Sequence, residues 1–119
     1  MKPNALVCVI DGDPAVRDSL ATLMSLNGHE VVTFATGQEF LDTLNGRLID
    51  CVVCEAELPD TSGIELFRKF KPENPLTRFA LLMSRTDPTA AAQARTSGVD
   101  AVFHKPLVHR RLTSFVKTI

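Results

Sequence analysis

The sequence contains no tryptophan and no tyrosine, so its seven phenylalanines are its only large aromatic residues. Flavin- and nucleotide-binding proteins of the α/β class typically stack the ligand on aromatic rings. They also cradle its phosphates in a loop rich in glycine, serine or threonine after the first strand. The corresponding loop here, residues 11–14, reads DGDP. The composition therefore argues against a flavin- or nucleotide-binding protein.

Neither sign of charge is in excess, because 13 basic and 14 acidic residues leave a formal net charge of -1. No global field therefore attracts nucleic acid or an anionic membrane. No apolar run approaches the roughly 18 residues that cross a bilayer, and residues 1–5 lack the apolar core of a signal peptide. We expect a cytoplasmic protein that binds neither membrane nor nucleic acid directly.

Cysteine is scarce and odd in number, with Cys8, Cys51 and Cys54 all in apolar runs. Cys51 and Cys54 have the spacing of a redox or metal motif. On an extended strand, however, residues three apart point to opposite faces and lie roughly 10 Å from each other. The pattern therefore predicts buried structural thiols and no disulfide framework.

Strand-like and helix-like segments alternate along the chain, which at 119 residues suits one domain, 1–119. The apolar, strand-like segments are 6–10, 30–35, 49–54, 79–84 and 101–103, and a helical pattern follows each, the last over 108–119. The helix over 89–96 is rich in alanine and has no strong apolar stripe, so we expect it to be loosely anchored. Five such units with right-handed crossovers predict an α/β fold: a doubly wound, five-stranded parallel sheet of order 2-1-3-4-5.

Polar side chains follow four of these strands at the carboxyl edge of the predicted sheet: Asp11, Glu55, Ser84 and Lys105. In open α/β sheets, ligands bind at this edge and the catalytic residues lie there. Carboxylates, a hydroxyl and a lysine suit phosphoryl handling with Mg²⁺. Any one such residue could merely solvate the edge, but four at matching positions favour a shared site.

The chain here resembles the receiver domains of two-component response regulators, the CheY-like superfamily. It is similar in particular to receivers of nitrogen-fixation-type transcriptional regulators. The resemblance runs from Leu6 to about Val116. The segments that carry it are VIDGDPAVRDSL at 9–20, EAELPDTSGIEL at 55–66, Ser84 and GVDAVFHKPL at 98–107. It implies a flavodoxin-like (βα)5 fold and a role in phosphorelay signal transduction, with no enzymatic activity expected.

Three positions depart from what the resemblance implies. Family receivers carry two adjacent acids after the first strand, the second binding Mg²⁺, where this chain has Asp11 and Gly12. Glu55 occupies the place of the aspartate that accepts phosphate. Val102 stands where an aromatic switch residue is usual, while Ser84 and Lys105 match the family's hydroxyl and lysine.

These departures predict a degenerate phosphoacceptor pocket without a cofactor, in which Mg²⁺ binding is weak or absent. Glutamate carries its carboxylate one methylene further than aspartate, and about 1 Å of misplacement can cost a positioned reaction about 100-fold. Asp13 is no substitute ligand, because it is expected to cap the following helix. Asp11 and Glu55 against Lys105 leave one negative charge that Arg85 could balance. We therefore expect a metal-free pocket of ion pairs, with Glu55 to Lys105 or Arg85 as the central contact.

Two functions are consistent with these sequence features. The first is an atypical receiver that acts independently of phosphorylation through protein contacts. Its docking face would be formed by 89–96, 101–103 and the final helix, where Arg110, Arg111 and Lys117 lie. The partner would be a protein or an output domain, with a homodimer left open. The alternative is a weakly active receiver that takes phosphate from a histidine kinase on Glu55. Whether Glu55 imitates a phosphorylated acid or fixes an inactive state stays open.

Overall fold

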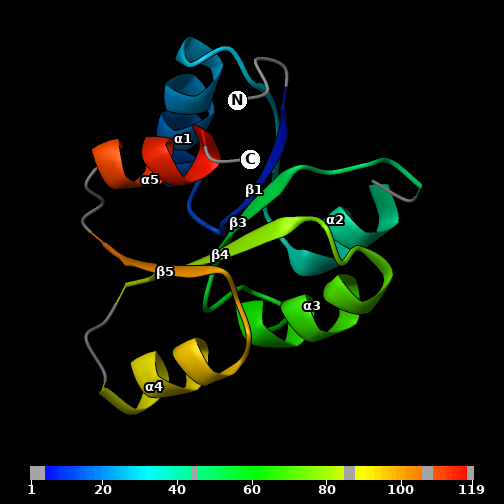
Figure 1. Cartoon of the computed structure of the whole chain (residues 1–119), viewed down its shortest axis with the longest axis vertical. Helices are drawn as coiled ribbons and strands as arrows, with labels where there is room; N and C mark the ends of the chain where they lie inside the picture. Colours follow the sequence, from blue (N-terminus) through cyan, green and yellow to red (C-terminus); the bar gives the residue numbers. More distant parts are fainter. Residues whose placement is uncertain (1–4, 44–45, 85–87, 106–108, 118–119) are drawn as a thin grey trace.

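The computed structural model describes residues 5–43, 46–84, 88–105 and 109–117. It forms one five-stranded parallel sheet with the order β2-β1-β3-β4-β5, as the sequence predicts (Figure 1). The strands are β1 Leu6–Ile10, β2 Glu30–Phe34, β3 Cys51–Glu55, β4 Arg78–Met83 and β5 Ala101–His104. The helices are α1 Pro14–Leu26, α2 Gly37–Thr43, α3 Gly63–Phe70, α4 Pro88–Thr96 and α5 His109–Lys117, with a 3-10 turn η1 at Lys71–Glu73. Predicted bounds differ by one or two residues, so that Glu55 closes β3 and Ser84 lies just beyond β4.

Helices cover both faces of the sheet, α1 and α5 on one side and α2, α3 and α4 on the other (Figure 1). Alternate residues of β1 divide between the two cores: Val7 and Val9 pack with α1 and α5, and Cys8 and Ile10 pack with α2, α3 and α4. All five residues of β1 are buried. Burial on both faces explains why β1, β3 and β4 are almost continuously apolar in sequence.

Three helix starts have side-chain caps, and the one at Asp13 is expected from the sequence. Asp13 Oδ1 accepts a hydrogen bond from Ala15 N at 2.9 Å, and Ser62 Oγ accepts one from Glu65 N at 3.1 Å. Thr36 Oγ1 accepts one from Glu39 N at 3.1 Å. These caps satisfy backbone donors that the first turn of a helix leaves unpaired. Asp87, which precedes Pro88 as Asp13 precedes Pro14, lies outside the described residues.

The two cysteines of the C-x-x-C pattern point to opposite faces of β3, as predicted. Cys51 belongs to the core beneath α1 and α5, and Cys54 to the core beneath α2, α3 and α4. Burial raises the pKa of Cys8 and of Cys51 to about 12 and raises the pKa of Cys54 further. All three are free, buried thiols.

The helix α4 contributes only small side chains to the core. Its buried residues are two alanines, Ala91 and Ala94. A groove of about 400 Å³ separates it from α3, with Ile64 and Met83 among the apolar residues that line it. Within the described ranges, every helix is too short or too polar to span a bilayer.

Candidate functional site

Three charged side chains from separate parts of the chain meet at the carboxyl edge of the sheet. Asp11 follows β1 and is fully buried, Glu55 is the last residue of β3, and Lys105 follows β5 directly. Parallel strands end at the same edge, and β1 pairs directly with β3, so the two acids become neighbours. We call this group the Asp11–Glu55–Lys105 cluster.

Lys105 lies between the two carboxylates of the cluster. Its Nζ is 3.0 Å from Asp11 Oδ2 and 3.5 Å from Glu55 Oε1. The shorter contact is therefore with Asp11, whereas Glu55 was expected to make the central one. The difference follows from burial, since an unpaired charge costs most where water is excluded, and Asp11 is 0% exposed against 17% for the Glu55 side chain.

The turn between β1 and α1 is tied to the cluster by backbone hydrogen bonds. Asp11 Oδ1 accepts from Asp13 N at 2.9 Å, and Glu55 Oε2 accepts from Gly12 N at 3.4 Å. Arg17 Nη1 donates to the carbonyl oxygen of Asp11 at 2.8 Å. Sequence reasoning did not find this role of Arg17, although a long cation in the first turn of a helix lies within reach of the preceding strand's last carbonyl.

The start of α3 packs against the main chain at Glu55 and holds it in place. Gly63 N donates to Ala56 O at 2.8 Å. A Cβ atom at position 63 would lie 2.6 Å from Glu55 O and 2.7 Å from Leu81 Cδ2, so a glycine is required there. Ala56 N also donates to Leu82 O at 2.8 Å. Together these contacts fix the backbone from which the Glu55 side chain extends.

The electrostatics of the cluster are those of two acids competing for one cation. Burial, a hydrogen bond with Asp11 and the Asp11 charge together raise the pKa of Glu55, and Lys105 opposes them only in part. Burial alone would lower the pKa of Lys105, but the hydrogen bond and charge of Asp11, with the charge of Glu55, raise it above its ordinary value. The cluster thus holds its lysine charged and disfavours a second ionised carboxylate.

The remaining predicted site residues are less closely joined. Ser84 is exposed, and in the described part of the chain no hydrogen bond links it to the cluster. Val102 is half-buried and packs against the core beneath α2, α3 and α4. Arg85, the predicted additional cation, lies outside the described residues.

The donor set does not match what a divalent ion needs. Gly12 contributes no side chain, and the two carboxylates present already contact an ammonium group. Among the residues described, no three His, Cys, Asp or Glu side chains are grouped so that they could hold a metal ion. What the arrangement can do is bind an oxygen atom through Lys105 or keep its own ion pairs.

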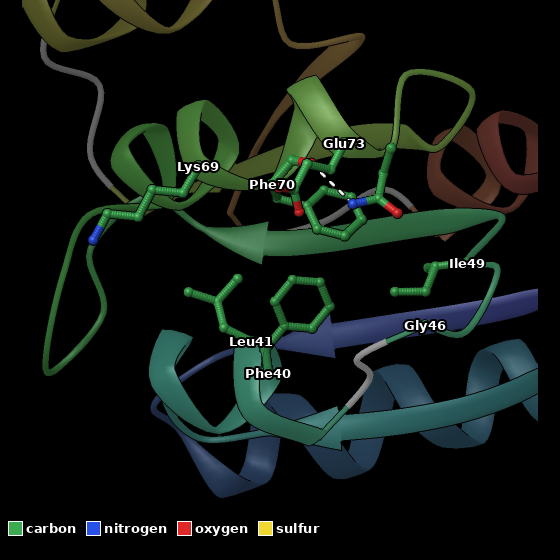
Figure 2. A pocket seen from close by; sticks show the side chains of 8 residues that line it. Phe40, Leu41, Gly46, Ile49, Lys69, Phe70 and Glu73 are labelled. Atoms are coloured by element: carbon green, nitrogen blue, oxygen red, sulfur yellow. Dashed lines mark hydrogen bonds between the residues drawn. The ribbon is translucent and has the colours of Figure 1, made fainter.

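A cavity elsewhere in the molecule is unrelated to this cluster. About 290 Å³ of space lies between α2 and the α3–η1 segment, where Phe40 and Leu41 project toward Phe70 (Figure 2). The rings of Phe40 and Phe70 are 5.1 Å apart between centroids. Asn74 Nδ2 donates to Phe70 O at 3.0 Å at its rim, and Lys69 points away from it (Figure 2). The cavity is a gap in core packing beside an aromatic cluster.

A family model described as the response regulator receiver domain matches residues 7–117. The chain belongs to the response regulator receiver domain family. This confirms the resemblance read from the sequence motifs, and it makes the chain a receiver domain of two-component signalling. The Asp11–Glu55–Lys105 cluster therefore lies at the carboxyl edge of a receiver.

Similar proteins agree with this assignment. The transcriptional regulatory protein FixJ of Bradyrhizobium diazoefficiens is 33% identical over 118 residues, which are 99% of this chain and 58% of FixJ. A full-length FixJ structure from B. japonicum superposes with a TM-score of 0.86 at 32% identity, covering 96% of this chain and 56% of that one. A receiver domain structure from Clostridium thermocellum gives a TM-score of 0.87 at 25% identity, covering 96% and 92%. The chain thus spans little more than half the length of FixJ.

Proposed function

We propose that this receiver works without phosphorylation and without a bound metal ion, as a fixed surface that binds a protein partner. The observation that carries the proposal is the position of Lys105 Nζ, 3.0 Å from Asp11 and 3.5 Å from Glu55. The cation stands between the two carboxylates that a metal ion would need. The ion pairs within the protein therefore take the place of an external ligand.

The proposed loss of Mg²⁺ binding follows from charge and geometry. Mg²⁺ demands near-octahedral oxygen ligands and gives up its water reluctantly, so it depends on closely placed carboxylates. Gly12 supplies none, and Lys105 offsets one of the two negative charges that remain. To bind between Asp11 and Glu55, the metal ion would have to displace an ammonium group that is already hydrogen-bonded.

The proposed loss of phosphate acceptance rests on Glu55. Its backbone is fixed by the start of α3, so the additional methylene carries the carboxylate toward β1, where Oε2 reaches Gly12 N at 3.4 Å. A group displaced from its reacting position by about 1 Å can lose about 100-fold in rate. Burial and Asp11 raise the pKa of Glu55 by more than Lys105 and Gly12 N lower it, so its surroundings disfavour the anion that would attack phosphorus.

A fixed surface is favoured over a permanently activated one by Val102. An aromatic side chain at that position could swing between a buried and an exposed rotamer, whereas a β-branched valine has one stiff torsion and packs against the core here. We therefore infer that Glu55 holds the domain in one state. The α4–β5–α5 face is then a constant docking surface for a protein or an output domain.

The wider role of the domain is also part of the proposal. FixJ, described as a transcriptional regulatory protein, is longer than this chain, and we infer that this receiver likewise serves transcription regulation in the cytoplasm. It would do so as a binding module with no catalytic activity and with no direct contact to nucleic acid. A histidine kinase would be a partner only under the alternative function.

Incubation with acetyl phosphate and Mg²⁺, followed by intact-mass spectrometry, tests the proposal. In phosphoryl transfer, a Glu55 carboxylate oxygen would bond to phosphorus while the phosphorus–oxygen bond to acetate breaks, leaving an acyl phosphate. We expect no stable mass increase of one phosphoryl group. An increase that disappears in Glu55→Gln would favour the weakly active receiver and overturn the proposal.

Placing aspartate at positions 12 and 55, as the family resemblance implies, provides the matched gain of function. We expect the double variant Gly12→Asp, Glu55→Asp to bind Mg²⁺ and to take phosphate from acetyl phosphate, while the wild type does neither. The new Cβ at position 12 would meet Pro59 at 3.3 Å, a contact that a small shift relieves. Gly12→Asn with Glu55→Asp controls for size without the added charge. Mg²⁺ binding by the wild type at low millimolar concentration, measured by calorimetry, would contradict the metal-free proposal.

A further inference from the structure

The small net charge of the chain is the sum of contributions from segments of opposite charge. Residues 13–43, which form α1, β2 and α2, contain five acids and one base, and residues 88–117, which form α4, β5 and α5, contain five bases and one acid. We call these segments the acidic flank and the basic flank. The acids of the first are Asp13, Asp18, Glu30, Glu39 and Asp42, and the bases of the second are Arg95, Lys105, Arg110, Arg111 and Lys117.

The sheet order places β2 and α2 of the acidic flank at the opposite edge of the sheet from β5 and α4 of the basic flank, while α1 and α5 share one core on the same face. β2 and β5 are the two edge strands of the order β2-β1-β3-β4-β5. The helices α4 and α5 lie on either side of β5 at one end of the sheet, and α2 lies toward the other end (Figure 1). The acids of β2 and α2 are therefore separated in space from the bases of β5 and α4, whereas α1 and α5 are neighbours.

In the described part of the chain, the minority charge and one majority charge of each flank make contacts with charged or main-chain partners outside their own helix or strand. Arg17 donates to Asp11 O, and Glu30 pairs with Arg47 at 3.1 Å. Asp100 pairs with Lys71 at 3.4 Å, and Lys105 lies in the cluster. Four further acids on one flank are exposed, Asp13, Asp18, Glu39 and Asp42, and four further bases on the other, Arg95, Arg110, Arg111 and Lys117. Asp13, Glu39 and Asp42 accept local hydrogen bonds from neutral donors, which leave their negative charge in place.

This distribution decides which kind of self-contact is favourable. A two-fold symmetric dimer through the basic flank would set the same patch against itself, cation against cation. Like charges brought together across an interface repel, and this repulsion excludes wrong partners. A head-to-tail contact sets the basic flank of one copy against the acidic flank of the next, so that unlike charges meet. Because β2 and α2 lie at the opposite edge of the sheet from β5 and α4, such a contact between these edges repeats.

We propose that the partner of the α4–β5–α5 face is the acidic flank of a second copy of this chain, in an open head-to-tail arrangement. This inference rests on the proposed protein-binding function of that face, and not on the state of the Asp11–Glu55–Lys105 cluster. Failure of the association test would leave the acetyl phosphate and Mg²⁺ results untouched. The two proposals can therefore fail separately.

Sedimentation velocity of the wild-type chain over a range of concentrations provides the first test. At about 0.01 M salt, where charges act over about 30 Å, we expect the mean mass to rise continuously with concentration past that of a dimer. At about 1 M salt, where they act over about 3 Å, we expect monomer. A monomer at all concentrations and low salt, or a dimer that does not grow further, overturns the proposal.

Two neutralised variants then test the polarity of the contact. The acid-neutral variant is Asp18→Asn, Glu39→Gln, Asp42→Asn, and the base-neutral variant is Arg110→Gln, Arg111→Gln, Lys117→Gln. We expect each alone to associate at least about tenfold more weakly than wild type. Mixed in equal amounts, they should form a one-to-one dimer and stop, because each contributes its one intact flank.

A third variant controls for the number of charges removed. Glu65→Gln, Arg68→Gln, Lys69→Gln neutralises three exposed side chains of α3, which belongs to neither flank. We expect its association to match that of the wild type. If this control weakens association as much as the flank variants do, or if the mixed variants fail to form a dimer, the head-to-tail contact is excluded.

Discussion

Two groups of one lysine and two aspartate or glutamate residues lie at opposite ends of the same sheet. At the carboxyl end, Lys105 contacts Asp11 and Glu55. At the amino end, Asp50 accepts from Leu6 N at 2.8 Å, and Asp100 accepts from Phe79 N at 2.7 Å and pairs with Lys71 at 3.4 Å. The amino-end acids bind the backbone of neighbouring strands, whereas the carboxyl-end acids share a lysine.

Strand direction explains the difference. Parallel strands begin with N–H groups that need acceptors, and a carboxylate placed there satisfies them. They end with C=O groups, which a carboxylate cannot satisfy. An acid at the amino end is therefore part of the sheet, and an acid at the carboxyl end is available for something else. Arg17, which donates to Asp11 O, shows that a cation performs the structural role at this end.

The largest expected effect separates the two lysines. Lys105→Met leaves Asp11, fully buried, facing Glu55 without a cation, so we expect the free energy of unfolding to fall by about 3 kcal/mol at neutral pH. Lys71→Met leaves Asp100 bound to Phe79 N, so we expect a loss of about 1 kcal/mol or less. Urea unfolding measures both. Equal losses of unfolding free energy would show that the acids at the two ends of the sheet depend equally on their lysines.

The next effect is a difference in sign between isosteric amide variants. Asp100→Asn weakens the bond to Phe79 N, and we expect a loss of about 1 kcal/mol. Glu55→Gln removes a carboxyl whose pKa burial and Asp11 raise, so we expect it to stabilise the protein at neutral pH. A raised carboxyl pKa means that the folded state binds more protons, so wild-type stability falls as pH rises through that pKa.

The advantage of Glu55→Gln should therefore shrink as the pH is lowered toward the ordinary glutamate pKa, because the wild-type carboxyl then takes up its proton. Urea unfolding of the two proteins across this range gives the trend. Destabilisation by Glu55→Gln at neutral pH that grows weaker at acid pH would instead mean that the Lys105 contact dominates.

The smallest effect is expected in the sheet that joins the two ends. Cys8, Cys51 and Cys54 are buried with raised pKa values, so they should react hardly at all with a disulfide reagent at mildly alkaline pH. We expect the same protection in folded Lys105→Met and Lys71→Met. Rapid labelling of Cys54 in Lys105→Met alone would show that the cluster also supports β3.

The sequence predicted much of this molecule because its signals are local or periodic. Fully buried strands, helix caps such as Asp13 and the polar residue at the end of four of the five strands follow from short patterns, and they indicate the fold class and most of the site. The partner that a long side chain contacts could not be predicted in this way. The choice of Asp11 over Glu55 by Lys105 depends on relative burial, which appears only when the strands are assembled.

Contacts between distant loops were also beyond the sequence patterns. Asp60 accepts hydrogen bonds from Gly37 N at 3.0 Å and from Gln38 N at 2.9 Å, across more than twenty residues. These backbone bonds outweigh desolvation and lower the pKa of Asp60. Thr36 and Glu39 have the local spacing of a capping box, whereas no local pattern indicates this second acceptor at the start of α2.

Gly63 has a consequence for how a domain of this kind can change over generations. The absence of a Cβ there allows α3 to begin against the carbonyl of Glu55, which fixes the main chain beneath that side chain. A substitution at position 55 therefore alters the length and charge of one side chain without moving the backbone around it. The side chain at position 55 and the fold around it can therefore evolve independently. A lineage can replace a phosphate acceptor by an ion pair while its fold stays the same.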